Sequence, residues 1–396
     1  MRERASELMR FLRLFICLSI PILLTACSSG VSPQAMAQER VFPKVSLEFL
    51  SEYDLPKTIY KDTPVGGLSA IAYNRNKNVF YALSDDRSVF APARFYTFSI
   101  EIDREKIDKI KLEDVTFLKT PQGNNYLPGS IDPEGLSLSP RNSVFISSEG
   151  IPNKNIAPFI AEFDLESGRQ ALNLRIPKRY LSDKTPENPQ PTRGIRENLG
   201  FEALTVNNIS SLPDDPFRIF AATESSLWQD TPSAIVSEAE TERMPQTRIR
   251  MLHYVINSVG SPGLLAEHLY LEDPAPPTVI NNGLTELLVF KERYFLSLER
   301  TFGLFGFGAK IFQVVVNNAN DTSRIDSLAG DISRVVPMRK KLLLDLSKLN
   351  ITLDNLEGMT VGPALPDGSS TLLLVSDNNF SQEQKTQFLL FRLVRE

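Results

Sequence analysis

The chain has 396 residues, a formal net charge of −5, two cysteines and two histidines. Residues 1–26 hold four arginines and two glutamates, so the rest of the chain carries a net charge of about −7 and is not expected to bind nucleic acid. Both cysteines, Cys17 and Cys27, precede the main body of the sequence. That body therefore has no disulfide, no thiolate catalysis and no cysteine-ligated zinc.

The N-terminal segment has the order of features that is typical of an export signal. Four arginines precede a short apolar core at residues 14–24, which is too short for a membrane-spanning helix. Leu-Thr-Ala-Cys at 24–27 then resembles a bacterial lipobox, in which the cysteine is lipidated after cleavage. We expect a signal peptide over 1–26, a lipid on Cys27 and a flexible tether over 27–43. An ordinary secreted protein is the alternative.

Lipidation predicts where the protein resides. Each buried CH₂ of an acyl chain contributes about 0.8 kcal/mol, so several chains on Cys27 would hold the protein on a membrane. Ser28 follows this cysteine, in place of the aspartate associated with retention at the inner membrane. The expected location is therefore the outer membrane, facing the periplasm or the cell surface, and we expect a monomer there.

Five segments of the chain share one pattern. Each has a short apolar run opened by Gly, Glu or Asn, a turn signal, a second apolar run, and then an acid, which reads as two antiparallel strands. The first residues of the segments are 68, 68, 80 and 75 residues apart. The segments are GGLSAIAYNRNKNVFYALSDDR (66–87), EGLSLSPRNSVFISSEG (134–150), EALTVNNISSLPDDPFRIFAATES (202–225), NGLTELLVFKERYFLSLER (282–300) and EGMTVGPALPDGSSTLLLVSDNN (357–379).

Further strand-like runs follow each pair, for example at 94–103 and 248–257, which gives about four strands per unit. Such a repeat predicts an all-β protein, a β-propeller over residues 44–396 with four antiparallel strands per blade. Five blades are counted directly, and a sixth could lie within the long units. The run at 44–53 could complete the last blade and close the ring. A solenoid is the competing fold, but it would need capping repeats, which the sequence does not show.

Antiparallel pairing places the start of each first strand and the end of each second strand at the same edge of a sheet. In a propeller, these positions from all blades meet at one mouth of the central channel. The opening positions are Gly66, Glu134, Glu202, Asn282 and Glu357, and the closing positions are Asp85, Glu149, Glu224, Glu299 and Asp377. The sequence therefore predicts an acidic rim.

A dense group of carboxylates raises the pKa values of its members or binds a cation. Oxygen ligands at this density suit Ca²⁺, with Mg²⁺ or Mn²⁺ as alternatives. The expected ligands are Asp85, Glu134, Glu202, Glu286, Glu299, Glu357 and Asp377. In the competing interpretation, acids after strands only accept N–H bonds in the following turns.

Arg87 and Arg300 each follow a rim acid directly. The planar guanidinium fork matches a phosphate or carboxylate, so the two arginines could bind an anionic substrate such as a phosphoester. We expect them to act in catalysis with Glu202 and Glu357, either of which could be a metal ligand or a general base. Alternatively, each arginine pairs with a neighbouring acid.

Several hydrolytic mechanisms are excluded by missing motifs. The sequence has no GxSxG, RHGxRxP or HExxH motif and no P-loop. His253 and His268 adjoin strand-like runs, where a packed or exposed histidine is expected rather than a catalytic base. An enzyme with this composition would be assisted by a metal ion.

The five motifs, in their order, resemble the phytase-like domain family, also called the esterase-like activity of phytase family, from about residue 64 to 394. The resemblance implies a β-propeller in an exported bacterial protein, with phosphoester hydrolysis as the activity. The Asp runs and Lys-rich phosphate sites of better characterised β-propeller phytases are not recognised here, so the resemblance does not imply phytate as the substrate.

Three hypotheses follow. The first is a lipid-anchored, Ca²⁺-dependent phosphoesterase that acts at the acidic mouth on a small phosphoester or other anion. The second is a propeller that binds a partner, with Ca²⁺ as a structural ion. The third is a hydrolase like the sugar lactonases, with Asn282 as a ligand beside Glu134 and Glu202.

Overall fold

The computed structural model describes residues 41–395, except 186–187, 208–211, 213–214, 233–245 and 292. The expected signal peptide, Cys27 and most of the expected tether lie outside the described residues. The compact unit of the chain runs from Pro43 to Glu396, and its architecture follows.

The chain forms five four-stranded antiparallel sheets, which confirms the all-β propeller. We number these blades 1 to 5, starting with the sheet that contains β4. In chain order, the strands are β1 (Val45–Leu55), β2 (Thr58–Tyr60), β3 (Thr63–Val65), β4 (Leu68–Asn74), β5 (Val79–Ser84), β6 (Arg94–Asp103), β7 (Lys106–Phe117), β8 (Pro133–Leu138), β9 (Ser143–Ser148), β10 (Phe159–Asp164), β11 (Gln170–Asn173), β12 (Phe201–Asn207), β13 (Phe217–Thr223), β14 (Arg248–Ile256), β15 (Gly263–Leu271), β16 (Val279–Lys291), β17 (Tyr294–Gly303), β18 (Gly306–Val315), β19 (Arg339–Asp345), β20 (Asn355–Ala364), β21 (Ser370–Asp377) and β22 (Thr386–Arg395).

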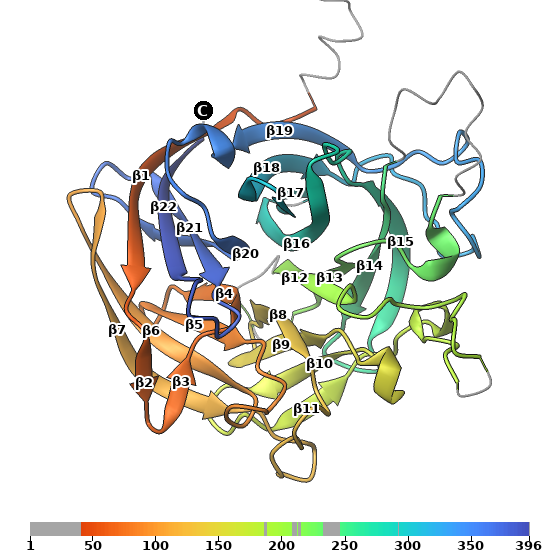
Figure 1. The fold of residues 1–396 in the computed structure, drawn as a ribbon, viewed down its shortest axis with the longest axis horizontal. Helices are drawn as coiled ribbons and strands as arrows, with labels where there is room; N and C mark the ends of the chain where they lie inside the picture. The colour runs from red at the N-terminus through yellow and green to blue at the C-terminus, as the bar shows by residue number, and fades with distance from the viewer. Residues whose placement is uncertain are drawn as a thin grey trace, which may run out of the picture. The chain divides into compact units, whose positions relative to one another are not determined.

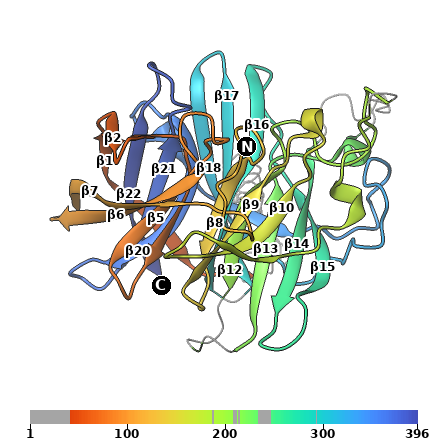
Figure 2. The ribbon, with the colours of Figure 1, turned by 90° about the horizontal axis from the view of Figure 1, so that it is seen from below.

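One edge strand of each blade lies at the centre of the molecule, as the view down the axis shows (Figure 1). These inner strands are β4, β8, β12, β16 and β20, and each contacts the inner strands of both neighbouring blades, β20 with β4 included. Seen from below, the same sheets stand side by side around the axis (Figure 2). The described residues thus form five blades, and no sixth blade is present among them.

The last blade combines the two ends of the described chain. β1 pairs with β22 in antiparallel register from Val45 opposite Arg395 to Leu55 opposite Thr386, and so forms the outer strand of the sheet β1-β22-β21-β20. A short hairpin, β2–β3, then leads into β4.

Apolar side chains fill the five interfaces between blades. Each buried cluster combines residues of two neighbouring blades, as the cluster of Phe80, Phe98, Leu373 and Phe388 does for blades 1 and 5. Strands that are buried on both faces read as apolar runs rather than as a strict alternation, which is the pattern of the repeats. The sheets are therefore held side by side by the hydrophobic effect around a narrow axis.

Two blades also contain a buried arginine at the start of the third strand. In blade 1, Arg94 Nη1 lies 2.7 Å from Asp86 Oδ2, and both side chains are buried. In blade 3, Arg250 makes a two-point pair with Asp230, at 2.6 and 2.8 Å, and contacts Glu267. Each aspartate lies in the loop that follows the second strand of its blade. The ion pair therefore fixes this loop against the third strand.

The helices among the described residues are 3₁₀ turns of three residues, such as Pro152–Lys154. A membrane-spanning helix is not found in this part of the chain.

Candidate metal centre

A cavity of about 680 Å³ opens where the first strands begin and the second strands end. Residues from all five blades line it, which confirms that the repeat brings distant acids to one mouth. Its carboxylates are Asp85, Asp86, Asp132, Glu134, Glu149, Glu202, Glu224, Glu357 and Asp377, and its cations are Arg87 and Arg300. Fully ionised, this lining would carry a strong excess of negative charge.

The strand register explains how three of the acids reach the cavity. Each inner strand has a β-bulge near its start, where one strand has an extra residue relative to its partner. The extra residue is Glu202 in β12 and Glu357 in β20, and Glu134 lies in the bulge of β8. A bulge re-aims a side chain, and here it turns these glutamates toward the axis.

The second strand of a blade supplies the neighbouring acid. Asp85, Glu149 and Glu224 come directly after β5, β9 and β13, and Asp377 is the last residue of β21. Gly67 makes room for Asp85: its φ is +62°, its carbonyl accepts the Asp85 N–H at 2.8 Å, and a Cβ there would lie 2.0 Å from the Asp85 carboxylate.

Besides Asp86, which Arg94 binds at 2.7 Å, five of the carboxylates are held by protein donors. Arg87 binds Asp132 at two points, 2.5 and 2.6 Å, and donates to Asn198 at 2.8 Å. Arg300 donates to Glu224 Oε1 at 2.6 Å and to Asn355 Oδ1 at 2.7 Å.

The remaining three of these five acids use backbone N–H groups or an amide. The backbone N–H of Gly200 donates to Glu149 at 2.6 Å, and that of Asn379 donates to Asp377 at 2.7 Å. Asn355 Nδ2 donates to Glu357 at 2.8 Å.

Three carboxylates have no such donor. The side chains of Asp85, Glu134 and Glu202 accept no hydrogen bond from the part of the chain that the structure describes, and Asp85 Oδ1 is fully buried as well. Glu134 and Glu202 are each 8% exposed. A buried anionic oxygen without a partner is costly, so Asp85 Oδ1 indicates a cation-binding role, and Glu134 and Glu202 add two carboxylates at the same cavity that no protein donor occupies.

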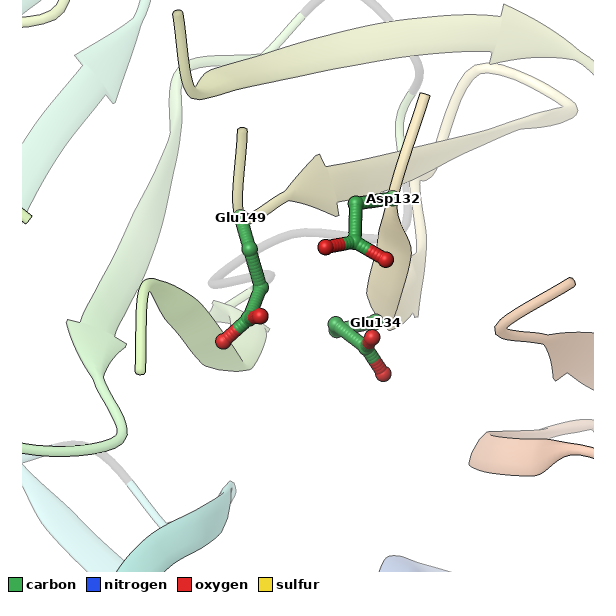
Figure 3. Close-up of side chains that lie close together, drawn as sticks. All are labelled: Asp132, Glu134 and Glu149. Atoms are coloured by element: carbon green, nitrogen blue, oxygen red, sulfur yellow. The ribbon is translucent and has the colours of Figure 1, made fainter. Parts of the chain in front are cut away.

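Two groups of three carboxylates are close enough to hold a metal ion. Asp132, Glu134 and Glu149 form one group, and Glu149, Glu202 and Glu224 form the other, with ligand oxygens within 4.8 Å of one another in each. Figure 3 shows the first group, in which the three side chains lie close together. Glu149 belongs to both groups, and the all-oxygen donor set suits Ca²⁺, Mg²⁺ or Mn²⁺.

Burial and mutual repulsion raise the pKa values of these acids. Burial is the larger cause for Glu134 and Glu202, and neighbouring carboxylates raise both pKa values further. Burial raises the pKa of Asp132 to about 6, although Arg87 opposes the change. The pKa of Asp377 likewise rises to about 6 through burial. A bound cation would reverse this trend by favouring the ionised forms.

The structure corrects the expected position of two residues. Glu299 does not line the cavity, because it pairs with Leu284 inside the long strand β17, and Arg300 occupies the place that acids hold in the other blades. Glu299 instead accepts from Tyr270 at 2.5 Å and binds Lys340 between blades 3 and 4.

Glu286 also lies outside the acidic cavity. It follows the bulge of β16, where other inner strands carry glycine or alanine, and it lines a separate space of about 150 Å³ along the channel. Its carboxylate accepts the N–H of Leu287 at 2.8 Å. Asn281 rather than Asn282 reaches the acidic cavity, so the ligand expected for a lactonase-like site is not in place.

Sequence reasoning missed Asp132 as a site residue, although its spacing of two residues from Glu134 was a usable signal. It also did not identify Phe90, Phe302 and Phe380, which belong to two aromatic pairs at the cavity mouth. Phe90 and Phe380 have ring centroids 4.6 Å apart, and those of Phe302 and Phe307 are 4.8 Å apart. Both pairs come from loops or strand ends, where the repeat has no counterpart in the other blades.

A family model described as "Phytase-like: Esterase-like activity of phytase" matches residues 63–380, most of the chain. The chain belongs to the phytase-like family. This confirms the resemblance drawn from the five motifs, and all the carboxylates of the acidic cavity lie within the matched residues. No match was found among curated proteins.

Solved structures resemble this chain only at low similarity. An endo-arabinase from Bacteroides thetaiotaomicron is 10% identical with a TM-score of 0.39, and the match covers 86% of this chain and 98% of the enzyme. An α-L-arabinofuranosidase from Podospora anserina is 8% identical with a TM-score of 0.40, over 87% and 97% of the two chains. Likenesses at this level carry no argument about the activity of the phytase-like protein.

Proposed function

We propose that the protein is a divalent-cation-dependent phosphoesterase that acts in the acidic cavity. The observation that carries this proposal is the set of carboxylates without protein donors, Asp85, Glu134 and Glu202, which line a cavity that two arginines also line. A phosphoester is an anion and would be repelled by the bare acids. Cation binding is therefore required before such a substrate can enter.

Ca²⁺ is the proposed ion, held by Asp132, Glu134 and Glu149, with further oxygen ligands from the cavity lining other than Glu202. Ca²⁺ takes six to eight oxygen ligands in flexible geometries, which a lining of carboxylates contributed by separate blades can supply. When bound, the ion would supply Lewis-acid stabilisation of charge on the phosphoryl oxygens.

Hydrolysis needs a base and a site for the phosphoryl group. Water attacks phosphorus, the bond from phosphorus to the ester oxygen breaks, and the proton of the water passes to a carboxylate. Glu202 suits the base, because its carboxylate is free of protein donors, whereas Glu357 is already bound by Asn355 at 2.8 Å.

The arginines would orient the phosphoryl oxygens. Arg300 Nε is buried without a hydrogen-bond partner among the described residues, while its two other nitrogens hold Glu224 and Asn355. Arg87 is held by Asp132 in a comparable way. Each guanidinium is thus held in place by an acid, as in the alternative that each arginine pairs with a neighbouring acid. The remaining N–H groups of each guanidinium can donate to a ligand.

The test is turnover of p-nitrophenyl phosphate and of inositol phosphates by the purified protein, with Ca²⁺ and with EDTA. We expect activity that is lost with chelator and reduced about 100-fold or more by Glu202→Gln, the usual contribution of a general base. Glu166→Gln, the same change at an exposed carboxylate, should leave the rate unaltered. Full activity in EDTA would refute the mechanism.

The same assay distinguishes the binding hypothesis. If Ca²⁺ raises the melting temperature while every ester stays at the background rate, the ion is structural and the propeller is a binding module. The donor-free carboxylates would then explain ion binding without catalysis.

We further propose that Cys27 carries lipid and anchors the enzyme to a membrane outside the cytoplasm. The support is the order of basic segment, apolar core and Leu-Thr-Ala-Cys in the sequence. Metabolic labelling with a palmitate analogue should mark the wild-type protein in its native host and not Cys27→Ser. A protein that is unlabelled and released from cells would contradict the anchor.

A further inference from the structure

The two histidines of the chain lie together in a second cavity. This cavity measures about 270 Å³, and its lining includes Asn207, Arg218, Phe220, His253, His268 and Arg293. The ring centroids of the two histidines are 6.0 Å apart. They stand on neighbouring strands, His253 on β14 and His268 on β15.

This cavity lies at the other end of blade 3 from the acidic one. Asn207 ends β12 and Arg218 is the second residue of β13, whereas Glu202 and Glu224 lie at the opposite ends of the same strands. The residues between these ends span about 15–20 Å at the usual rise per residue of a strand. The histidine cavity is therefore a separate site, with no role in the proposed hydrolysis.

Its charge is opposite to that of the acidic cavity. Arginine side chains line it, and no carboxylate does so among the described residues. Arg218 makes no ion pair with any described residue. Its side chain contacts His253, with Nη1 3.5 Å from Nε2 of the imidazole. A half-buried guanidinium without a carboxylate leaves an uncompensated positive charge in the cavity.

The histidines are buried and held in place. His253 stacks on Phe220 with ring centroids 4.3 Å apart and is 8% exposed. His268 is 7% exposed, and its Nδ1 lies 3.2 Å from the carbonyl oxygen of Asn320, to which Nδ1–H donates. The second ring nitrogen of His268, Nε2, then remains for a ligand or a proton.

We propose that this cavity binds a small oxyanion, phosphate or carboxylate, between Arg218 and the two imidazoles. The guanidinium supplies a planar donor fork, and each imidazole that takes up a proton supplies a further charged donor. Burial, and after it the charge of Arg218, lower the pKa of His253 to about 4, and a bound anion would offset the second of these causes.

The charged groups around the rings favour coupling between anion binding and protonation. Arg218 is the cationic group that contacts the rings. Glu267 and Asp321 lie near His268, but Glu267 binds Arg250, and Asp321 accepts the backbone N–H groups of Glu267 and Ser323. These acids are engaged elsewhere, so the charge of Arg218 is the one that an anion in the cavity would meet.

Histidine NMR provides a direct test, because the chain gives two imidazole signals, which His253→Gln assigns. The full-length protein, freed of divalent cations, is titrated with inorganic phosphate and separately with acetate at pH 6.5 and constant ionic strength. We expect both imidazoles to shift toward the protonated form with saturation by about 20 mM, roughly 20 times a Kd of 1 mM. The arm that saturates at the lower concentration identifies the oxyanion.

Arg218→Gln should abolish the shifts, while Arg175→Gln, at an exposed arginine outside the cavity, should preserve them. Unchanged melting temperatures would show that both variants fold. The proposal is overturned if neither anion gives saturable shifts in the wild type, or if Arg218→Gln responds as the wild type does.

Discussion

At the scale of single residues, the acidic cavity separates into two kinds of carboxylate. Asp132 and Glu224 are tied to arginines, whereas Glu134 and Glu202 meet no donor of the described chain. The tied acids place the arginines, and the untied acids carry like charges in a poorly solvated space. Binding capacity and instability are therefore expected at the same residues.

Neutralising an untied acid should stabilise the protein that lacks a cation. Glu134→Gln and Glu202→Gln keep the side-chain shape and remove a charge whose ionisation burial disfavours. We expect a higher free energy of unfolding in EDTA, because glutamine carries no charge whose burial opposes folding. Denaturant unfolding measures it, with Glu166→Gln as control. Destabilised glutamine variants would contradict this account of the site.

The same acids make stability depend on pH. The pKa values of Asp132 and Asp377 rise from 3.8 to about 6 in the folded protein, so the folded state binds more protons than the unfolded state between these values. Stability without a cation should therefore fall as pH increases from about 4 to 6. Acids with larger increases extend the fall to higher pH.

Melting curves from pH 4 to 8 check this slope. Saturating Ca²⁺ should flatten it, because the ion favours the ionised carboxylates and adds about 2.7 kcal/mol at 100 times its Kd. A slope of the opposite sign in EDTA would show that these acids are ionised in the folded protein without a cation.

At the scale of elements, the β-bulges show what the sequence could and could not predict. Apolar runs and turn signals predicted the paired strands, and the acids at their ends predicted the rim. Alignment of the repeated motifs placed Glu299 among the acids that close the second strands. The register of β16 and β17 instead puts Arg300 at the cavity position that an acid occupies in the other blades. A bulge changes which residue faces which way, and no local pattern marks its position.

The extended hairpin of β17 and β18 brings one aromatic pair to the cavity. Phe302 lies opposite Phe307 in register, and Phe302 is 39% exposed. We expect Phe302→Ala to increase KM for p-nitrophenyl phosphate about threefold to tenfold through the loss of ring contacts, with a smaller effect on kcat. Steady-state kinetics at saturating Ca²⁺ measure this change.

Phe49→Ala, in the outer strand β1 of blade 5, serves as the control for an aromatic truncation far from the mouth. An equal KM for wild type and Phe302→Ala would remove the aromatic pair from substrate binding.

At the scale of the whole molecule, residues far apart in the chain meet because five blades surround one axis. Repeat spacing predicted this arrangement, including the meeting of Glu134, Glu202 and Glu357 at one cavity. Contacts that depend on the irregular segments could not be predicted. Asn198 precedes β12 and Phe380 follows β21, and neither position recurs in the repeat.

Blade 5 depends on both ends of the described chain, which makes β1 a test of the assembly. Deleting residues 44–55 would leave the long edge of β22 unpaired and expose the apolar face beneath β1. We expect a lower melting temperature and aggregation, observed by light scattering. Replacing the exposed residue Asp103 by Asn gives a folded control. A monomeric deletion variant of full stability would contradict the role of β1.

The most direct test of the central claim, that the blades bring carboxylates together to hold a divalent cation, is calcium titration by calorimetry. The account predicts that the purified, chelator-treated wild-type protein binds at least one Ca²⁺ per chain with micromolar to millimolar Kd, and that Glu134→Gln/Glu202→Gln abolishes this binding without unfolding the propeller. A wild-type protein that binds no Ca²⁺, Mg²⁺ or Mn²⁺ at about 10 mM, or a double variant that binds as the wild type does, would contradict it.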